Sequence, residues 1–76
     1  MSYSRDDYDP ARLAEWPAEV RGEIFRQLRA DKGYSVEDMA VTCGLTVGEI
    51  TAIEAGNIPN PDYIHRVAHA LGLIAS

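Results

Sequence analysis

Hydrophobic side chains recur every three or four residues in four stretches of this chain. A period near 3.6 residues places such side chains on one face of an α-helix, and no alternating stretch is long enough to predict a strand. The rows expected to face inward are Val20, Ile24, Phe25 and Leu28, then Met39, Ala40 and Cys43, then Ile50 and Ile53, and finally Ile64, Val67, Ala68 and Leu71. The pattern therefore predicts an all-α protein.

Residues that begin and end helices lie between these rows. In a capping box, the N-cap side chain and the side chain three positions later each accept a backbone N–H. The pairs that fit this pattern are Ser35 with Asp38 and Thr46 with Glu49. Other expected starts are Asp9-Pro10 and Asn60-Pro61, and the expected stops are Gly33, Gly44, Gly56 and Gly72. These signals predict a compact bundle of about five short helices, the first running to about Glu15.

The chain divides into a short tail and one domain. Residues 1–8 are polar, acidic and without periodicity, so we expect a flexible N-terminal tail ahead of a single domain over residues 9–76. The two helices with capping boxes are joined only by Gly44-Leu45. A glycine-containing link this short sets two helices at a steep angle, which is the helix-turn-helix arrangement.

Acidic residues outnumber lysine and arginine by 12 to 7, for a net charge of −5. Such a balance repels phosphate backbones and acidic membrane surfaces unless a local basic patch overrides it. The single cysteine, Cys43, excludes an internal disulfide and suits a reducing compartment. No apolar run approaches the roughly 20 residues that cross a bilayer. We expect a cytoplasmic protein that does not bind membranes.

One combination of residues carries a family likeness. It consists of Leu28-Arg29, Gly33, Ser35, Ala40, Gly44-Leu45, Ile50, Ile53-Glu54, Gly56 and Ala70-Leu71-Gly72. With these residues, the stretch from Leu28 to Leu73 (46 of the 76 residues) resembles the lambda-repressor-like (Cro or XRE type) helix-turn-helix domains. The resemblance implies the lambda-repressor-like fold. It also implies a structural ion pair between Arg29 and Glu54, which ties the first long helix to the recognition helix.

The chain departs from this family where relatives contact DNA. Relatives read base edges with the helix that here begins near Thr46. The positions expected to face outward are Val36, Val47, Gly48 and Ala52. Bidentate base readout uses Arg, Lys, Asn or Gln, and none of these residues stands there. No cation lies between Lys32 and Arg66 either, so the groups that release counterions from phosphates are missing.

These positions instead predict a partner-binding face of small and apolar residues edged by carboxylates. Its expected members are Val36, Val47, Gly48, Glu49, Ala52, Ala55 and Ile58. Because Gly48 costs a helix about 1 kcal/mol relative to alanine, close approach by a partner is one reason for it. The alternatives are an ordinary exposed surface and a patch sealed by the N-terminal segment.

The chain is also similar in size and character to the small helix-turn-helix antiactivators of quorum-sensing-controlled conjugative elements in rhizobia. This likeness implies a transcription regulator that binds a protein partner, a transcriptional activator, and blocks its contact with DNA or its dimerisation. A groove of the activator would receive the apolar face, and its basic surface would attract the acids. The alternatives are a sequence-specific DNA-binding repressor of the Cro/XRE type and the antitoxin of a toxin–antitoxin pair.

No pattern predicts catalysis, a cofactor, a small-molecule substrate or a metal site. His65 and His69 are four residues apart on one helix, but a closed metal site needs two further ligands. We expect surface imidazoles there and a packed thiol at Cys43, which belongs to an inward row. The chain contains no glycine-rich phosphate loop and no serine–histidine–acid set, so we expect a protein that is not an enzyme.

Two further features concern the first half of the chain. Trp16 is expected to fold the first helix over the bundle as a core residue. The long second helix also carries cations, which could form a weak basic strip for DNA or for an acidic partner. They are Arg21, Arg26, Arg29 and Lys32.

Overall fold

Capping residues and prolines fix where the helices of this chain begin. The computed structural model describes residues 8–57 and 60–74, and all regular structure in this part of the chain is helical. The helices are η2 (Pro10–Glu15), α1 (Ala18–Asp31), α2 (Val36–Cys43), α3 (Val47–Glu54) and α4 (Pro61–Ala70). The predicted all-α bundle is thus confirmed. Residues 1–7 of the predicted tail, and Ile58 of the predicted face, lie outside the described residues.

Both predicted capping boxes are confirmed. At the start of α2, Ser35 Oγ accepts the Asp38 N–H and the Asp38 carboxylate accepts the Ser35 N–H, each at 3.0 Å. At the start of α3, Thr46 Oγ1 accepts the Glu49 N–H at 3.1 Å and Glu49 accepts the Thr46 N–H at 2.8 Å. Each box satisfies two backbone donors that a first helical turn leaves without partners.

The start of α4 and the helix ends also follow the sequence. The Asn60 side chain accepts the Asp62 N–H at 3.0 Å, with proline at the first helical position. The glycines after the four α-helices all have positive φ; they are Gly33, Gly44, Gly56 and Gly72. Gly44 has a φ of 69°, in the left-handed region, and this conformation turns the chain so that the Leu45 N–H donates to the Ala40 carbonyl at 2.9 Å. The chain therefore leaves α2 and enters α3 within residues 44–46.

The first predicted helix forms as a 3₁₀ helix. Asp9 caps it by accepting the Ala11 N–H at 2.9 Å. The Asp9 backbone carbonyl accepts the Trp16 indole N–H at 3.0 Å, and this bond folds the segment back on itself. Trp16 is consequently only 6% exposed, with its ring edge-on to that of Tyr8. Trp16 is therefore a core residue, as predicted.

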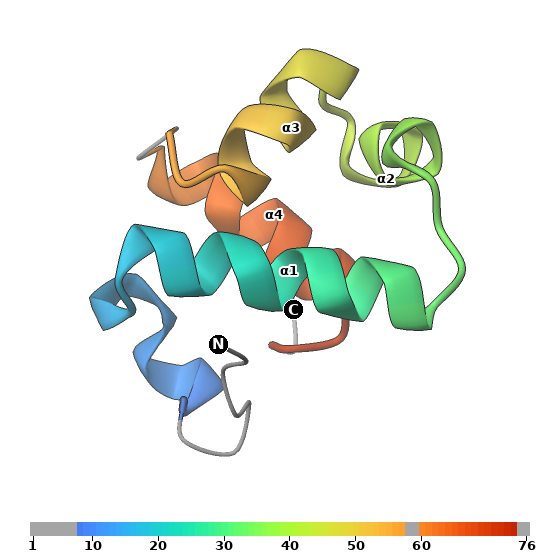
Figure 1. Cartoon of the computed structure of the whole chain (residues 1–76). Coiled ribbons are helices and arrows are strands. Elements are labelled where there is room, and N and C mark those ends of the chain that lie inside the picture. Colours follow the sequence, from blue (N-terminus) through green and yellow to red (C-terminus); the bar gives the residue numbers. More distant parts are fainter. Residues whose placement is uncertain (1–7, 58–59, 75–76) are drawn as a thin grey trace.

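Figure 1 shows α1 running across the molecule, with α2 and α3 on one side of it, η2 on the other and α4 behind. The core lies where these helices meet. Its most buried large side chains are Ile24, Phe25, Met39, Ile50 and Val67, which come from all four α-helices. Every residue of the predicted inward rows is buried except Leu28, which is half-buried and packs against the core.

Two contacts hold α3 against α1. The first is at Gly22, which is buried in the middle of α1. A methyl group there would overlap the backbone carbonyl of Glu54 and would lie 2.9 Å from the carbonyl oxygen of Ile53. The absence of a side chain is therefore what lets the end of α3 lie directly on α1.

The second contact is the ion pair between Arg29 and Glu54 that the family resemblance implies. Arg29 Nε donates to Glu54 Oε2 at 2.7 Å and Nη2 donates to Oε1 at 3.1 Å, a bidentate geometry. The two side chains are only 16% and 10% exposed. The hydrogen bond to Glu54 raises the pKa of Arg29, which favours the charged form of the guanidinium. The pair thus ties the C-terminal half of α1 to the C-terminal end of α3.

Replacing Glu54 by alanine is expected to lower the free energy of unfolding by about 1.5–3 kcal/mol, because Arg29 loses charge-assisted hydrogen bonds in a mostly buried place. Urea unfolding followed by circular dichroism measures this loss. Glu23→Ala is the matched control, since it removes the more exposed pair with Arg26 within α1. The control should cost less than about 1 kcal/mol, and equal losses would contradict a structural role for the α1–α3 pair.

Gly22→Ala is expected to lower the free energy of unfolding by about 1–3 kcal/mol, since the added methyl group pushes α3 away from α1. Gly48→Ala in α3 is the opposite case. A Cβ there would have only Thr46 Oγ1 near it, at 3.9 Å, so the change should stabilise the fold by up to about 1 kcal/mol. Thermal unfolding of both variants measures the difference. A neutral Gly22→Ala would show that the helices are not in close contact.

Candidate functional site

α2 and α3 form the helix-turn-helix predicted from the short link at Gly44-Leu45. In Figure 1, α2 is seen nearly end-on whereas α3 lies across the view, so the two helices cross steeply. Ile50 and Ile53 bury one side of α3 in the core, which turns its opposite side outward. The outward sides of α2 and α3 together are the outer face, and they form the candidate site.

The predicted face residues of α3, and Ala55 just after it, reach the surface to different degrees. Val47, Gly48 and Ala55 are exposed, whereas Glu49 and Ala52 are half-buried. Val47 is a large apolar side chain with 43% of its surface exposed. The open space around Gly48 means that the fold itself gives no reason for a glycine there. These residues offer a small-residue surface with one prominent apolar side chain.

Val36, the predicted member of the outer face on α2, is less accessible than Val47. Its side chain is half-buried, as are those of Glu49 and Ala52, and it packs in part against the hydrophobic core. The reason is helical spacing, because positions three, four and seven residues later are the buried Met39, Ala40 and Cys43. Val36 therefore begins the inward row of α2.

Sequence reasoning missed the most exposed large apolar side chain of the described chain, which is Val41. It lies on α2 and is 84% exposed. The signal was present, because the inward row of α2 passes through residues 36, 39, 40 and 43 and leaves position 41 outside it. Val41 is therefore the large apolar side chain that α2 exposes to solvent.

The electrostatic character of the outer face comes from its carboxylates. Asp38 and Glu49 lie at the N-terminal ends of α2 and α3 as members of the capping boxes. The hydrogen bond from the Thr46 backbone N–H lowers the pKa of Glu49, which keeps this carboxylate charged at neutral pH. Neither α2, α3 nor their link contains a lysine or arginine.

One cation reaches this region from α4. Arg66 Nη1 lies 4.0 Å from the position that a Cβ on Gly44 would take, so Arg66 sits beside the helix-turn-helix link. It pairs with Asp62 at 3.2 Å and lies over the ring of Tyr63. The sequence alone did not predict that Arg66 lies here, because its position depends on the packing of α4 against α2. Arg66 is thus a solvent-exposed cation that pairs with a carboxylate of its own helix.

The predicted basic strip on α1 does not form. Arg21 is buried, with 8% exposure, and Arg29 is paired with Glu54. Arg26 is exposed but forms a bidentate pair with Glu23. Of the four cations, one is buried, two are held in ion pairs and only Lys32 remains exposed without an ion pair among the described residues. They therefore offer no continuous basic surface to an anion.

The histidines and the cysteine of the described residues do not form a second candidate site. Within residues 8–57 and 60–74, no group of three or more His, Cys, Asp and Glu side chains is placed to hold a metal ion, and His65 and His69 are exposed on α4. Cys43 is a buried free thiol that donates to the Arg66 carbonyl at 3.9 Å. Burial raises the pKa of this thiol, which disfavours the reactive thiolate. No helix in the described part of the chain is long and apolar enough to span a bilayer.

Comparison with known proteins assigns the larger part of the chain to a family. A family model described as helix-turn-helix matches residues 25–74, which are 50 of the 76 residues and include α2, α3 and α4 entirely. Searches of curated proteins and of solved structures gave no match. Because the matched segment covers more than half of the chain, this protein belongs to the helix-turn-helix family of Cro/XRE-type regulators.

Proposed function

We propose that this protein is an antiactivator, a non-enzymatic regulator that binds a transcriptional activator through the outer face of α2 and α3. The observation that carries this proposal is that the outer face is apolar and lacks cations of its own, with Val41 84% and Val47 43% exposed. Contiguous exposed apolar patches with a polar rim commonly mark protein-binding sites, and we take the outer face to be one such patch. The likeness to rhizobial antiactivators extends the proposal to quorum-sensing-controlled conjugative transfer, exerted in the cytoplasm.

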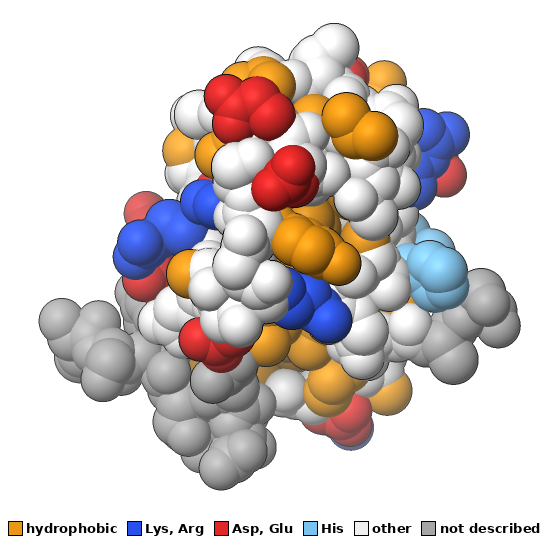
Figure 2. Space-filling view, turned by 90° about the vertical axis from the view of Figure 1, so that its right-hand side faces the viewer, with side chains coloured by type: hydrophobic (Ala, Val, Ile, Leu, Met, Phe, Trp, Pro, Cys, Tyr) orange, Lys and Arg blue, Asp and Glu red, His pale blue; other side chains and the backbone are white. Residues whose placement is uncertain are grey.

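Charge around the outer face supports a basic protein as the partner. In the upper part of Figure 2, where Figure 1 places α2 and α3, hydrophobic and acidic side chains lie together, with Lys and Arg at the sides and below. The surface by which an activator contacts DNA is positively charged. Such a surface would be attracted by Glu37, Asp38 and Glu49, while its apolar parts would cover the valines.

The same features make the outer face poorly suited to DNA. Val41, Val47 and Gly48 have no side-chain group that donates or accepts a hydrogen bond, whereas bases are read mainly by Arg, Lys, Asn and Gln. Free N–H groups at helix N-termini often bind phosphate. At α2 and α3 the carboxylates of Asp38 and Glu49 instead accept the N–H groups of the N-cap residues Ser35 and Thr46, which places negative charge beside each helix start. A phosphate approaching either helix start would therefore meet negative charge.

A second candidate function is operator binding, as a Cro/XRE-type repressor or as an antitoxin. Membership of the helix-turn-helix family favours it. So does Arg66, which stands beside the helix-turn-helix link and whose side chain is 48% exposed. Its pairing with Asp62 weakens that argument, because a phosphate would have to displace the carboxylate.

Partner capture tests the outer face directly. Co-purification from the native host followed by mass spectrometry identifies the activator, and Val41→Asp and Val47→Asp should each lower its affinity at least about tenfold. The reason is that each change buries a charge in an apolar contact. Circular dichroism and the melting temperature should stay nearly unchanged, since both side chains are exposed.

The matched control is Ala30→Asp, an equally acidic change at an exposed position of α1 away from the outer face, which should retain full capture. Undiminished capture by both valine variants would refute the proposed binding face. Unfolding of Val47→Asp would show that this side chain belongs to the core.

DNA binding separates the two candidate functions. Fluorescence anisotropy with the DNA upstream of this gene, at about 50 mM salt, should show no salt-sensitive binding, because the outer face has no cations that release counterions. Arg66→Gln serves as the comparison variant. Sub-micromolar binding with a steep salt slope, weakened by Arg66→Gln, would instead establish the operator-binding function.

A further inference from the structure

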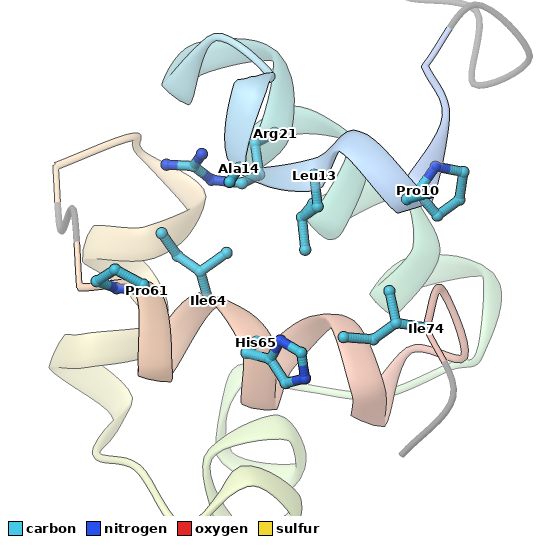
Figure 3. A pocket seen from close by; sticks show the side chains of 9 residues that line it. Pro10, Leu13, Ala14, Arg21, Pro61, Ile64, His65 and Ile74 are labelled. Atoms are coloured by element: carbon cyan, nitrogen blue, oxygen red, sulfur yellow. The ribbon is translucent and has the colours of Figure 1, made fainter.

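A pocket lies on the other side of α1 from the outer face, between η2 and α4. Its volume is about 490 Å³, within the range of small-molecule sites. Most of its lining is apolar and comes from η2, α4 and the segment after α4; it includes Pro10, Leu13, Ala14, Ile64 and Ile74. Figure 3 shows the side chains of Leu13, Ile64 and Ile74 pointing into this space.

The unusual member of the lining is Arg21. Its side chain belongs to α1 and is buried, with 8% exposure. Among the described residues, its side chain forms one hydrogen bond, a long one from Nη1 to the Trp16 carbonyl at 3.5 Å. No carboxylate of the described residues forms an ion pair with it. Burial lowers the pKa of Arg21, because desolvation disfavours the charged form of the guanidinium.

Charge and apolar surface are segregated within the pocket. In Figure 3 the guanidinium of Arg21 lies at the end near Pro61 and Ile64, whereas Pro10 and Ile74 lie toward the opposite end. His65 is exposed and also lines the pocket, between Ile64 and Ile74 in Figure 3. The pocket thus presents a cation at one end, and mostly apolar side chains together with the His65 imidazole along the rest of its length.

We propose that this pocket binds a small monocarboxylate with an alkyl chain, its carboxylate on the guanidinium of Arg21 and its chain along Leu13, Ile64 and Ile74. A guanidinium presents a planar fork of N–H donors that matches the two oxygens of a carboxylate. The alkyl chain removes apolar pocket surface from water, which favours binding further. The site is distinct from the outer face and does not depend on the proposed antiactivator function.

Octanoate and 1-octanol are matched probes, since they share a chain length and differ in the charged end. In ¹H–¹⁵N correlation spectra, octanoate should shift amide signals of η2 and α4, with a dissociation constant of about 1 mM or tighter. The uncharged 1-octanol should bind at least about tenfold more weakly because it lacks the charge-assisted pair. Signals of α2 and α3 on the outer face should not move.

Two variants test the two ends of the pocket. Arg21→Met should weaken octanoate at least about tenfold and leave 1-octanol unchanged, whereas Arg26→Met at an exposed position of α1 should alter neither. Ala14→Trp keeps Arg21 and adds bulk at an exposed lining position, so it should abolish both.

Equal binding of the two probes, octanoate binding that survives Ala14→Trp, or no shifts in η2 and α4 would overturn the proposal. Loss of octanoate binding in Arg21→Met counts in its favour only if that variant retains the wild-type spectrum elsewhere. If Arg21→Met fails to fold, the effect of Ala14→Trp and the comparison of octanoate with 1-octanol still test the proposed site.

Discussion

The attachment of α3 to α1 is the constraint on which the rest of the structure depends. An eight-residue helix such as α3 is shorter than the roughly 12–15 residues that an isolated helix needs in water, so its stability and direction come from packing. Both attachments converge on Glu54. Its backbone lies against Gly22, and its carboxylate is held by Arg29. Fixing this end of α3 determines which side chains of the helix-turn-helix reach solvent.

The acidic residues of the outer face have a structural explanation, whereas its exposed valines and its lack of cations do not. Asp38 and Glu49 are accounted for by capping, because each accepts a backbone N–H at a helix start and would do so whatever the partner. They are therefore weak grounds for a protein-binding function. The features that capping leaves unexplained are the exposed Val41 and Val47 and the lack of any lysine or arginine between residues 33 and 65. These carry the functional proposal.

Local signals in the sequence were sufficient for the helix boundaries, because caps, prolines and glycines act over three or four residues. The Thr46–Glu49 box and the turn at Gly44 are examples. Contacts between helices were predictable only where the family resemblance supplied them, as for Arg29 with Glu54. The burial of Arg21 required knowing that η2 folds back over α1, and the place of Arg66 required knowing that α4 packs on α2. Neither follows from periodicity.

The helix η2, which lines the pocket, and the helices α2 and α3 of the outer face lie on opposite sides of α1 (Figure 1), and this separation decides how the two sites can influence each other. A ligand that binds only the folded chain stabilises it by mass action, without altering any surface. It changes the affinity for a protein partner only if its own affinity differs between the partner-bound and free forms. Arg21 and Gly22 are adjacent, and Gly22 touches the end of α3. Occupation of the pocket would therefore reach the outer face only through a shift of α1 at this point, and the unchanged signals expected for α2 and α3 mean that no such shift accompanies binding.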